Sequence, residues 1–161
     1  MPDDFQFSSG LTAYETLAFW AALRGVQKTR VTELLSEVGL EETGRKAVSS
    51  FSKGMRQRVV FAQALLARPA LVLMDEPTNG LDPYWMETFA RMVKETAANG
   101  QTVIFSTHQL QIAESLADRI ALLRGGQIEL EGSAAHIRGR LGAAGVQEAF
   151  AEWFGLSGIS S

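Results

Sequence analysis

Two adjacent carboxylates, Asp75 and Glu76, follow a four-residue apolar run at residues 71–74 (LVLM). Such a run is typical of a short strand that is buried on both faces of a parallel sheet. The two acids then stand at the edge of a core, where like charges about 4 Å apart repel by roughly 4 kcal/mol at an effective dielectric of about 20. A bound Mg²⁺ cancels this repulsion, and a carboxylate at a strand tip is a recurrent ligand for Mg²⁺ on a nucleotide. We therefore predict a magnesium–nucleotide site at Asp75.

A histidine, His108, follows a second apolar run, TVIFST at residues 102–107. In open α/β sheets ligands bind beyond the C-terminal ends of the strands, so His108 is expected beside the two acids. There Glu76 can orient or deprotonate an attacking water, and His108 can donate a hydrogen bond to a terminal phosphate. The alternative is that Asp75 and Glu76 only begin a polar turn. The continuation TNGLDP at residues 78–83 and the strand-end histidine favour the functional interpretation.

The elements that must hold these residues alternate between helix and strand. Thr12 and Glu15 have the spacing of a capping box, and Ser52 and Asp82 are further N-cap residues, the latter followed by Pro83. The order strand, helix, strand, helix, strand predicts an α/β parallel sheet with right-handed crossovers. The expected helices span residues 13–24, 31–38, 52–66, 83–99, 110–116, 134–141 and 146–154, and the expected hairpin strands span 120–123 and 128–130.

Composition places the chain among globular domains of ordinary size. Of its 161 residues, 46% are apolar and 20% are charged, and the net charge of −3 argues against a nucleic-acid partner, which would favour a basic face. The absence of cysteine excludes disulfides and thiolate metal sites. Two histidines make a multi-histidine metal site a poor interpretation, and no run reaches the roughly 18 apolar residues of a membrane span.

The acidic residues and His108 resemble the motifs of the nucleotide-binding subunit of an ATP-binding cassette (ABC) transporter, and the similarity covers essentially the whole chain. Asp75 and Glu76 are similar to the Walker B aspartate and the catalytic glutamate of that family, and His108 is similar to its switch histidine. The stretch NGLD at residues 79–82 resembles the D-loop, which implies that Asp82 lies at a dimer interface. The resemblance implies ATP and Mg²⁺ as cofactors, with Asp75 as the metal ligand.

The segment FSKGMRQR at residues 51–58 resembles the signature motif of the same family, whose commonest form is Leu-Ser-Gly-Gly-Gln. Its variant Ser52-Lys53-Gly54-Met55 is similar to that of a subgroup that drives simple exporters, including antibiotic-resistance and copper-maturation transporters. A helix N-terminus offers free amides and a partial positive charge, and the Ser52 hydroxyl adds a donor, so the segment suits a phosphate. The resemblance implies that it faces the nucleotide held by the opposite subunit. The alternative is that Ser52 only caps its helix.

The opening residues 1–4, Met-Pro-Asp-Asp, resemble the segment in which the family often has Pro-Gln, a loop that contacts both the metal and the membrane subunit. Asp3 occupies the glutamine position. An acid can sense Mg²⁺ through water, but an ionised carboxylate cannot donate a hydrogen bond. The alternative interpretation is an unstructured terminus.

No G-x-x-x-x-G-K-[ST] loop, which would cradle the β- and γ-phosphates, occurs in the sequence. The resemblance therefore implies the C-terminal two-thirds of a P-loop NTPase-like ABC ATPase, an α/β parallel sheet with a helical subdomain but without the N-terminal strands and the phosphate loop. We expect a helical subdomain at about 5–60, an α/β core at about 65–132 and C-terminal helices at about 133–161. We also expect the chain alone to bind MgATP no tighter than about 1 mM, without turnover, and to expose an apolar edge at 103–106.

The resemblance implies an ATP-hydrolysing subunit of an exporter, docked at the cytoplasmic face of the cell membrane on a transmembrane permease subunit and dimerised with a second ABC ATPase subunit. Two alternatives stay open. One is a catalytically incomplete module that lends its signature face to a partner. The other is a soluble ABC ATPase that acts on DNA or ribosomes, against which the acidic balance and the lack of a basic stripe argue.

Overall fold

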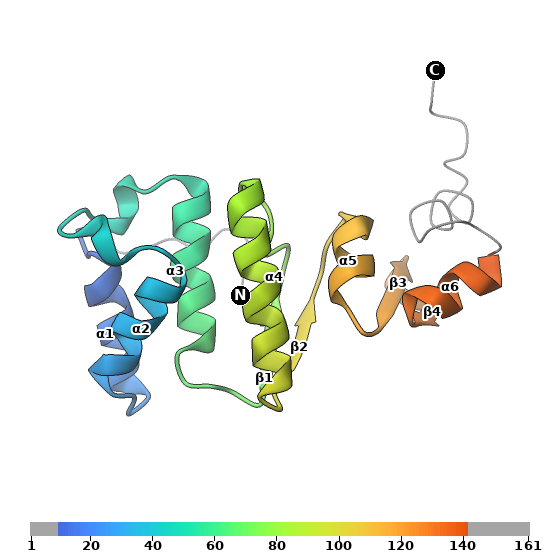
Figure 1. The fold of residues 1–161 in the computed structure, drawn as a ribbon, viewed down its shortest axis with the longest axis horizontal. Helices are drawn as coiled ribbons and strands as arrows, with labels where there is room; N and C mark the ends of the chain where they lie inside the picture. Colours follow the sequence, from blue (N-terminus) through green and yellow to red (C-terminus); the bar gives the residue numbers. More distant parts are fainter. Residues whose placement is uncertain (1–9, 142–161) are drawn as a thin grey trace, which may run out of the picture. The chain divides into compact units, whose positions relative to one another are not determined.

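The computed structural model describes residues 10–141, and the chain divides into two compact units, Met1–Ser106 and Thr107–Ser161. The first unit begins with a group of helices and continues into a small α/β layer (Figure 1). Asp3 and the predicted helix at 146–154 lie outside the described residues. The elements of the first unit are α1 (Ala13–Leu23), α2 (Lys28–Glu37), the 3₁₀ turns η1 (Glu41–Thr43) and η2 (Val48–Ser50), α3 (Lys53–Leu65), β1 (Leu71–Met74), α4 (Pro83–Ala98) and β2 (Thr102–Phe105).

Helices α1, α3 and α4 begin directly after the predicted N-cap residues. The backbone N–H of Glu15 donates to the Thr12 hydroxyl at 3.1 Å, and the Glu15 carboxylate accepts the Thr12 backbone N–H at 2.9 Å, which completes the predicted capping box. The backbone N–H of Thr12, together with its hydroxyl, which also donates to the Glu15 carboxylate at 2.9 Å, lowers the pKa of Glu15 from its usual value. The apolar sides of α1 and α2 then meet in a core that contains the fully buried Leu17, Val31 and Leu34.

The α/β layer pairs β1 with β2 in parallel, as the sequence predicts. Leu73 stands opposite Ile104 and Met74 opposite Phe105. One face of this sheet packs on α4, where the buried Phe89 contacts Phe61 of α3 (ring centroids 5.1 Å apart) and Phe105 of β2 (6.3 Å). The predicted crossover helix therefore sits on the sheet and forms the centre of an aromatic core.

The prediction that the strand at residues 71–74 is buried on both faces is wrong, and the second strand is exposed on the same face. Leu71, Leu73 and Ile104 are 48%, 55% and 55% exposed, while Val72 and Met74 are buried. Cross-strand partners share a face, so the three exposed residues form one apolar surface on the side of the sheet away from α4. Within residues 10–141 the sheet has two strands only. Both of its faces carry apolar side chains, but only the face that packs on α4 is covered.

The second unit holds α5 (Leu110–Leu116), β3 (Ile120–Arg124), β4 (Gln127–Gly132) and α6 (Ala134–Leu141). The predicted hairpin is confirmed: β3 and β4 pair antiparallel, with a register shift between Leu122 and Leu123. The predicted continuation of the parallel sheet into this strand is wrong, because β3 forms a separate two-stranded sheet with β4. The apolar residues of the hairpin instead make a local cluster with Ala113 of α5 and Ile137 of α6. No helix within residues 10–141 has both the length and the apolar character needed to cross a bilayer.

Candidate functional site

The Asp75–Glu76 pair stands directly after β1 and is tied to the end of β2 by one side chain. The Ser106 hydroxyl donates a hydrogen bond to Asp75 Oδ1 at 2.6 Å and accepts the backbone N–H of Glu76 at 2.9 Å. The backbone N–H of Ser106 in turn donates to the Met74 carbonyl oxygen at 3.0 Å, which extends the parallel pairing by one step. The two strand ends are thereby joined at the acidic pair.

Glu76 has a left-handed backbone conformation with φ of 43°. A non-glycine residue in this region costs on the order of 1–3 kcal/mol and persists only where its surroundings impose it. Here the bond to Ser106 fixes the residue on one side, and the turn closes on the other through the Asn79 N–H, which donates to the Glu76 carbonyl oxygen at 3.1 Å. Thr78 in the same turn is fully buried. The turn therefore holds Glu76 in one orientation relative to Asp75.

Magnesium fits the donor set at Asp75. Asp75 Oδ1 accepts the hydrogen bond from Ser106, and the exposed carboxylate keeps acceptor capacity for a cation. Mg²⁺ is usually held by one or two carboxylates together with nucleotide phosphates and water, not by a cage of protein ligands. Among residues 10–141 there is no group of three or more acidic or histidine side chains placed to hold a metal ion.

Asp82 caps α4, as its sequence position predicts. Its carboxylate accepts the backbone N–H of Trp85 at 3.0 Å. The guanidinium group of Arg58, a residue of α3, stacks on the Trp85 ring. Its central carbon lies 3.8 Å from the ring centroid. Burial lowers the pKa of Arg58 from its usual value, and the Asp82 carboxylate partly opposes that shift. This stack joins α3 to the start of α4.

The signature-like segment contacts the D-loop-like segment at two glycines. A Cβ atom on Gly54 would lie 2.6 Å from the carbonyl oxygen of Gly80, closer than real Cβ contacts come. Gly80 has a φ of 79°, and the aliphatic stem of Lys53 lies over it. The Ser52 hydroxyl accepts the Met55 N–H at 3.2 Å and so caps α3. Ser52 and Lys53 are exposed, which leaves this helix end accessible.

The predicted site residues therefore fall into two groups within the first unit. Asp75 and Glu76 share one turn, while residues 52–55 and the segment of Asp82 approach each other through the glycine contact. Figure 1 shows the N-terminal ends of α3 and α4 at the same end of this unit. His108 belongs to the second unit, so its position at a phosphate stays a prediction.

Sequence reasoning missed Ser106 and the Arg58–Trp85 stack. Ser106 lies in the quoted run TVIFST, and the register of two parallel strands places it opposite the residue that follows Met74. Aligning the last apolar residues of the two predicted strands would have found it. Arg58 and Trp85 carry no such signal, because their contact depends on how α3 and α4 pack.

Comparison with known proteins gives concordant relatives. The protein-family model described as "AAA domain, putative AbiEii toxin, Type IV TA system" matches residues 9–114. The linearmycin resistance ATP-binding protein LnrL of Bacillus subtilis (strain 168) is 34% identical over 162 residues, which cover 93% of this chain and 52% of the relative. The bacitracin transport ATP-binding protein BcrA of Enterococcus faecalis is 41% identical over 138 residues, 83% of this chain and 45% of the relative.

A solved structure, titled "Structure of ATP binding subunit of ABC transporter", superposes with a TM-score of 0.85 at 32% identity and covers 94% of this chain and 65% of that one. The chain spans about half the length of the curated relatives it matches. These matches confirm the P-loop NTPase fold that the sequence motifs imply. The chain thus belongs to the family of this AAA-domain model, and its homologues are ATP-binding proteins of ABC transporters.

Proposed function

We propose that this chain is the ATP-hydrolysing part of an ABC exporter. Members of the family are ATPases, and the observation that carries the proposal is the acidic turn, in which Ser106 fixes Asp75 and Glu76 at the joined ends of two parallel strands. Bound Mg²⁺ would neutralise charge on the β- and γ-phosphates. Asp75 would orient its second carboxylate oxygen toward that ion, and Glu76 would accept a proton from the attacking water.

The remaining predicted residues complete this proposal. Ser52, Lys53, Gly54 and Met55 would present the N-terminus of α3 to a nucleotide held by a second ATPase subunit, since the helix end carries no acidic residue in its first turn. Asp82 would lie at the subunit interface, His108 would donate to the γ-phosphate, and Asp3 would sense the metal through water.

Export, in place of import, is supported by the names of the relatives. They include linearmycin resistance, bacitracin transport, lantibiotic transport and fluoroquinolones export ATP-binding proteins. We propose that this chain, too, docks on a transmembrane permease subunit at the cytoplasmic face of the membrane. The names of these relatives refer to resistance and transport, whereas the toxin appears only in the family description.

A second candidate function is favoured by one observation: Ser52 and Lys53 of the signature-like segment are exposed at the N-terminus of α3, where a partner's nucleotide could reach them. In this alternative the chain binds a complete ATPase subunit and supplies residues 52–55 to that subunit's nucleotide. Glu76 would then have no catalytic task.

One experiment separates the two candidates. The protein is purified together with a transmembrane permease subunit and a second ATPase subunit, and MgATP hydrolysis is compared for wild type, Glu76→Gln and Ser52→Ala. If the chain is catalytic, Glu76→Gln lowers turnover by at least about 100-fold, since a general base typically contributes that much or more. If it only lends its signature face, Ser52→Ala lowers turnover by about tenfold or more, the loss of a charge-assisted hydrogen bond, and Glu76→Gln leaves it unchanged.

The matched control is Glu87→Gln, which removes an exposed carboxylate of α4 that is not among the predicted site residues. It should leave turnover at the wild-type rate. Wild-type turnover in both Glu76→Gln and Ser52→Ala would overturn the catalytic proposal and its alternative together.

A further inference from the structure

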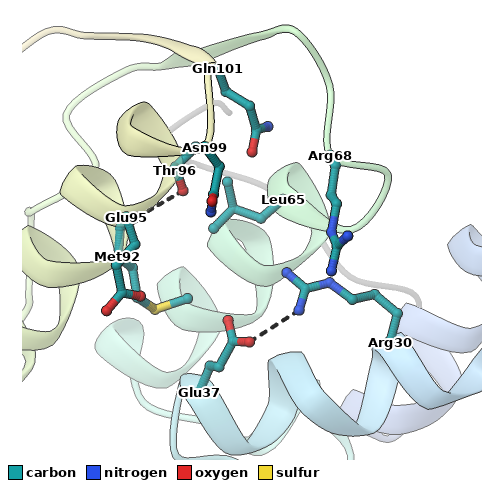
Figure 2. Close-up of a pocket in the computed structure, with 9 residues that line it drawn as sticks. All are labelled: Arg30, Glu37, Leu65, Arg68, Met92, Glu95, Thr96, Asn99 and Gln101. Atoms are coloured by element: carbon teal, nitrogen blue, oxygen red, sulfur yellow. Dashed lines mark hydrogen bonds and ion pairs between the residues drawn. The ribbon is translucent and has the colours of Figure 1, made fainter.

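A cavity of about 510 Å³ opens in the first unit at the C-terminal end of α4, lined by that helix, α2, the end of α3 and the connections that lead into β1 and β2 (Figure 2). Asp82 caps the opposite end of α4. A helix of 16 residues is about 24 Å long at 1.5 Å per residue, so the cavity is separate from the acidic turn and from Ser52. Nothing in the proposed ATPase chemistry uses it.

Two arginines from different elements enter this cavity. Arg30 extends from α2 and Arg68 from the connection between α3 and β1, and Figure 2 shows their guanidinium groups directed toward one another. Arg30 Nη1 is paired with the carboxylates of Glu33 (3.2 Å) and Glu37 (3.0 Å), but its Nε is buried and has no hydrogen-bond partner within the described residues. An N–H group buried without an acceptor is unfavourable, so the Arg30 guanidinium beside the cavity is incompletely satisfied by its two glutamates.

The Arg68 guanidinium makes no hydrogen bond or ion pair with any residue between 10 and 141. Its charge therefore faces a second guanidinium without an anion between them. Guanidinium groups bind carboxylates and phosphates through paired N–H donors in a planar fork, which is the arrangement that would relieve this repulsion.

The backbone of Arg68 adds an independent observation. Its φ is 46°, a left-handed conformation that glycine adopts without strain and arginine does not. The residue stands just before Pro69, whose carbonyl oxygen accepts from Gln101 Nε2 at 2.6 Å, so the connection is held in place. Residue 68 therefore has a backbone conformation that favours glycine, yet it is an arginine whose side chain enters the cavity.

The rest of the lining limits the kind of anion. The buried side chains of Leu65 and Met92 form an apolar part of the wall, and the amides of Asn99 and Gln101 add neutral polar groups. Glu37 and Glu95 also line the cavity and would repel a doubly charged phosphate more strongly than a singly charged carboxylate. We propose that this cavity binds a small organic carboxylate, whose carboxyl group bridges Arg68 and Arg30 and whose apolar body lies on Leu65 and Met92.

Benzoate is the probe that tests this proposal, because it combines a carboxylate with a compact apolar body. The Nε–Hε resonances of the arginines are followed by NMR in the purified chain during titration with benzoate, with its neutral amide benzamide, and with inorganic phosphate. We expect saturable shifts of the Arg30 and Arg68 resonances with benzoate, with a Kd of about 1 mM or tighter, and at least about tenfold weaker responses to benzamide and phosphate. Equal responses to benzoate and benzamide, stronger binding of phosphate, or no saturation with benzoate would overturn the proposal.

Two substitutions separate binding from folding. Arg68→Gln removes the charge, while Arg68→Gly also relieves the left-handed backbone, so we expect Arg68→Gly to keep or raise the melting temperature and still lose the benzoate response at least tenfold. Arg45→Gln, at an exposed arginine that does not line the cavity, is the matched control and should bind benzoate like wild type. Wild-type benzoate affinity in Arg68→Gly, or an equal loss in Arg45→Gln, would refute the site. Neither result depends on ATP hydrolysis.

Discussion

The two faces of the β1–β2 sheet are built from similar apolar residues but have different surroundings. On one face Val72 and Met74 are buried beneath α4, where Phe89 links α3 to β2 through ring contacts. On the other face Leu73 and Ile104 are opposite each other and about half exposed. Apolar burial is worth about 25 cal/mol per Å² of surface removed from water, so only the first face contributes its full share to stability. Residue type alone does not distinguish them; the covering element does.

The largest effect is expected on the covered face. Phe89→Ala removes the ring that contacts both Phe61 and Phe105 and leaves a cavity, which should lower the free energy of unfolding by about 3–5 kcal/mol. Urea unfolding followed by fluorescence measures this loss. Lys94→Ala, at an exposed position on the same helix, is the control and should change stability by no more than about 0.5 kcal/mol. A loss below about 1 kcal/mol for Phe89→Ala would mean that the aromatic contacts do not hold this layer together.

An intermediate effect is expected at the strand tips, where the two faces meet the acidic turn. Ser106→Ala removes one donor and one acceptor, but Ser106 is exposed and water can replace it, so the global cost should be about 1 kcal/mol. The local effect is more specific. The Glu76 amide should exchange with solvent about fivefold faster, the factor that corresponds to about 1 kcal/mol.

Ser106→Thr is the control for this prediction, because it keeps the hydroxyl and suits a strand. It should restore slow exchange at Glu76. If the Glu76 amide exchanges at the same rate in wild type and Ser106→Ala, the serine does not hold the turn, and the restraint on the Asp75–Glu76 pair must come from elsewhere in it.

The contrast between the faces also explains what the sequence could predict. Local signals were reliable: Thr12, Ser52 and Asp82 all cap the helices they were expected to cap, because a cap depends on three or four neighbouring residues. The acidic pair at the end of β1 and the parallel partner of that strand were also predicted correctly. These features need only a short run and its flanking turn.

Features that depend on distant residues were not predicted. The exposure of Leu73 and Ile104 depends on which elements cover the sheet. A short apolar run has the same sequence pattern whether one face of its strand is covered or both are. Ser106 contacts a carboxylate 31 residues away, which requires the strand register. The left-handed Arg68 precedes a proline and is not glycine, so no turn rule marks it. The roles of His108 and Asp3 remain predictions.

The smallest effect on stability, and the most specific effect on association, is expected on the uncovered face. Leu73→Thr combined with Ile104→Thr replaces a half-exposed apolar pair with residues that keep the β-branched preference for strands, so the free energy of unfolding should change by no more than about 0.5 kcal/mol. Within residues 10–141 no third strand pairs with β2, and exposed apolar strands with unpaired edges promote association. The double variant should therefore shift sedimentation velocity profiles from oligomer toward monomer.

Leu123→Thr, at a similarly exposed leucine on β3, tests whether general surface hydrophobicity is responsible and should leave the profile unchanged. A monomeric wild type, or an equal shift with Leu123→Thr, would show that the uncovered face has no special role in association.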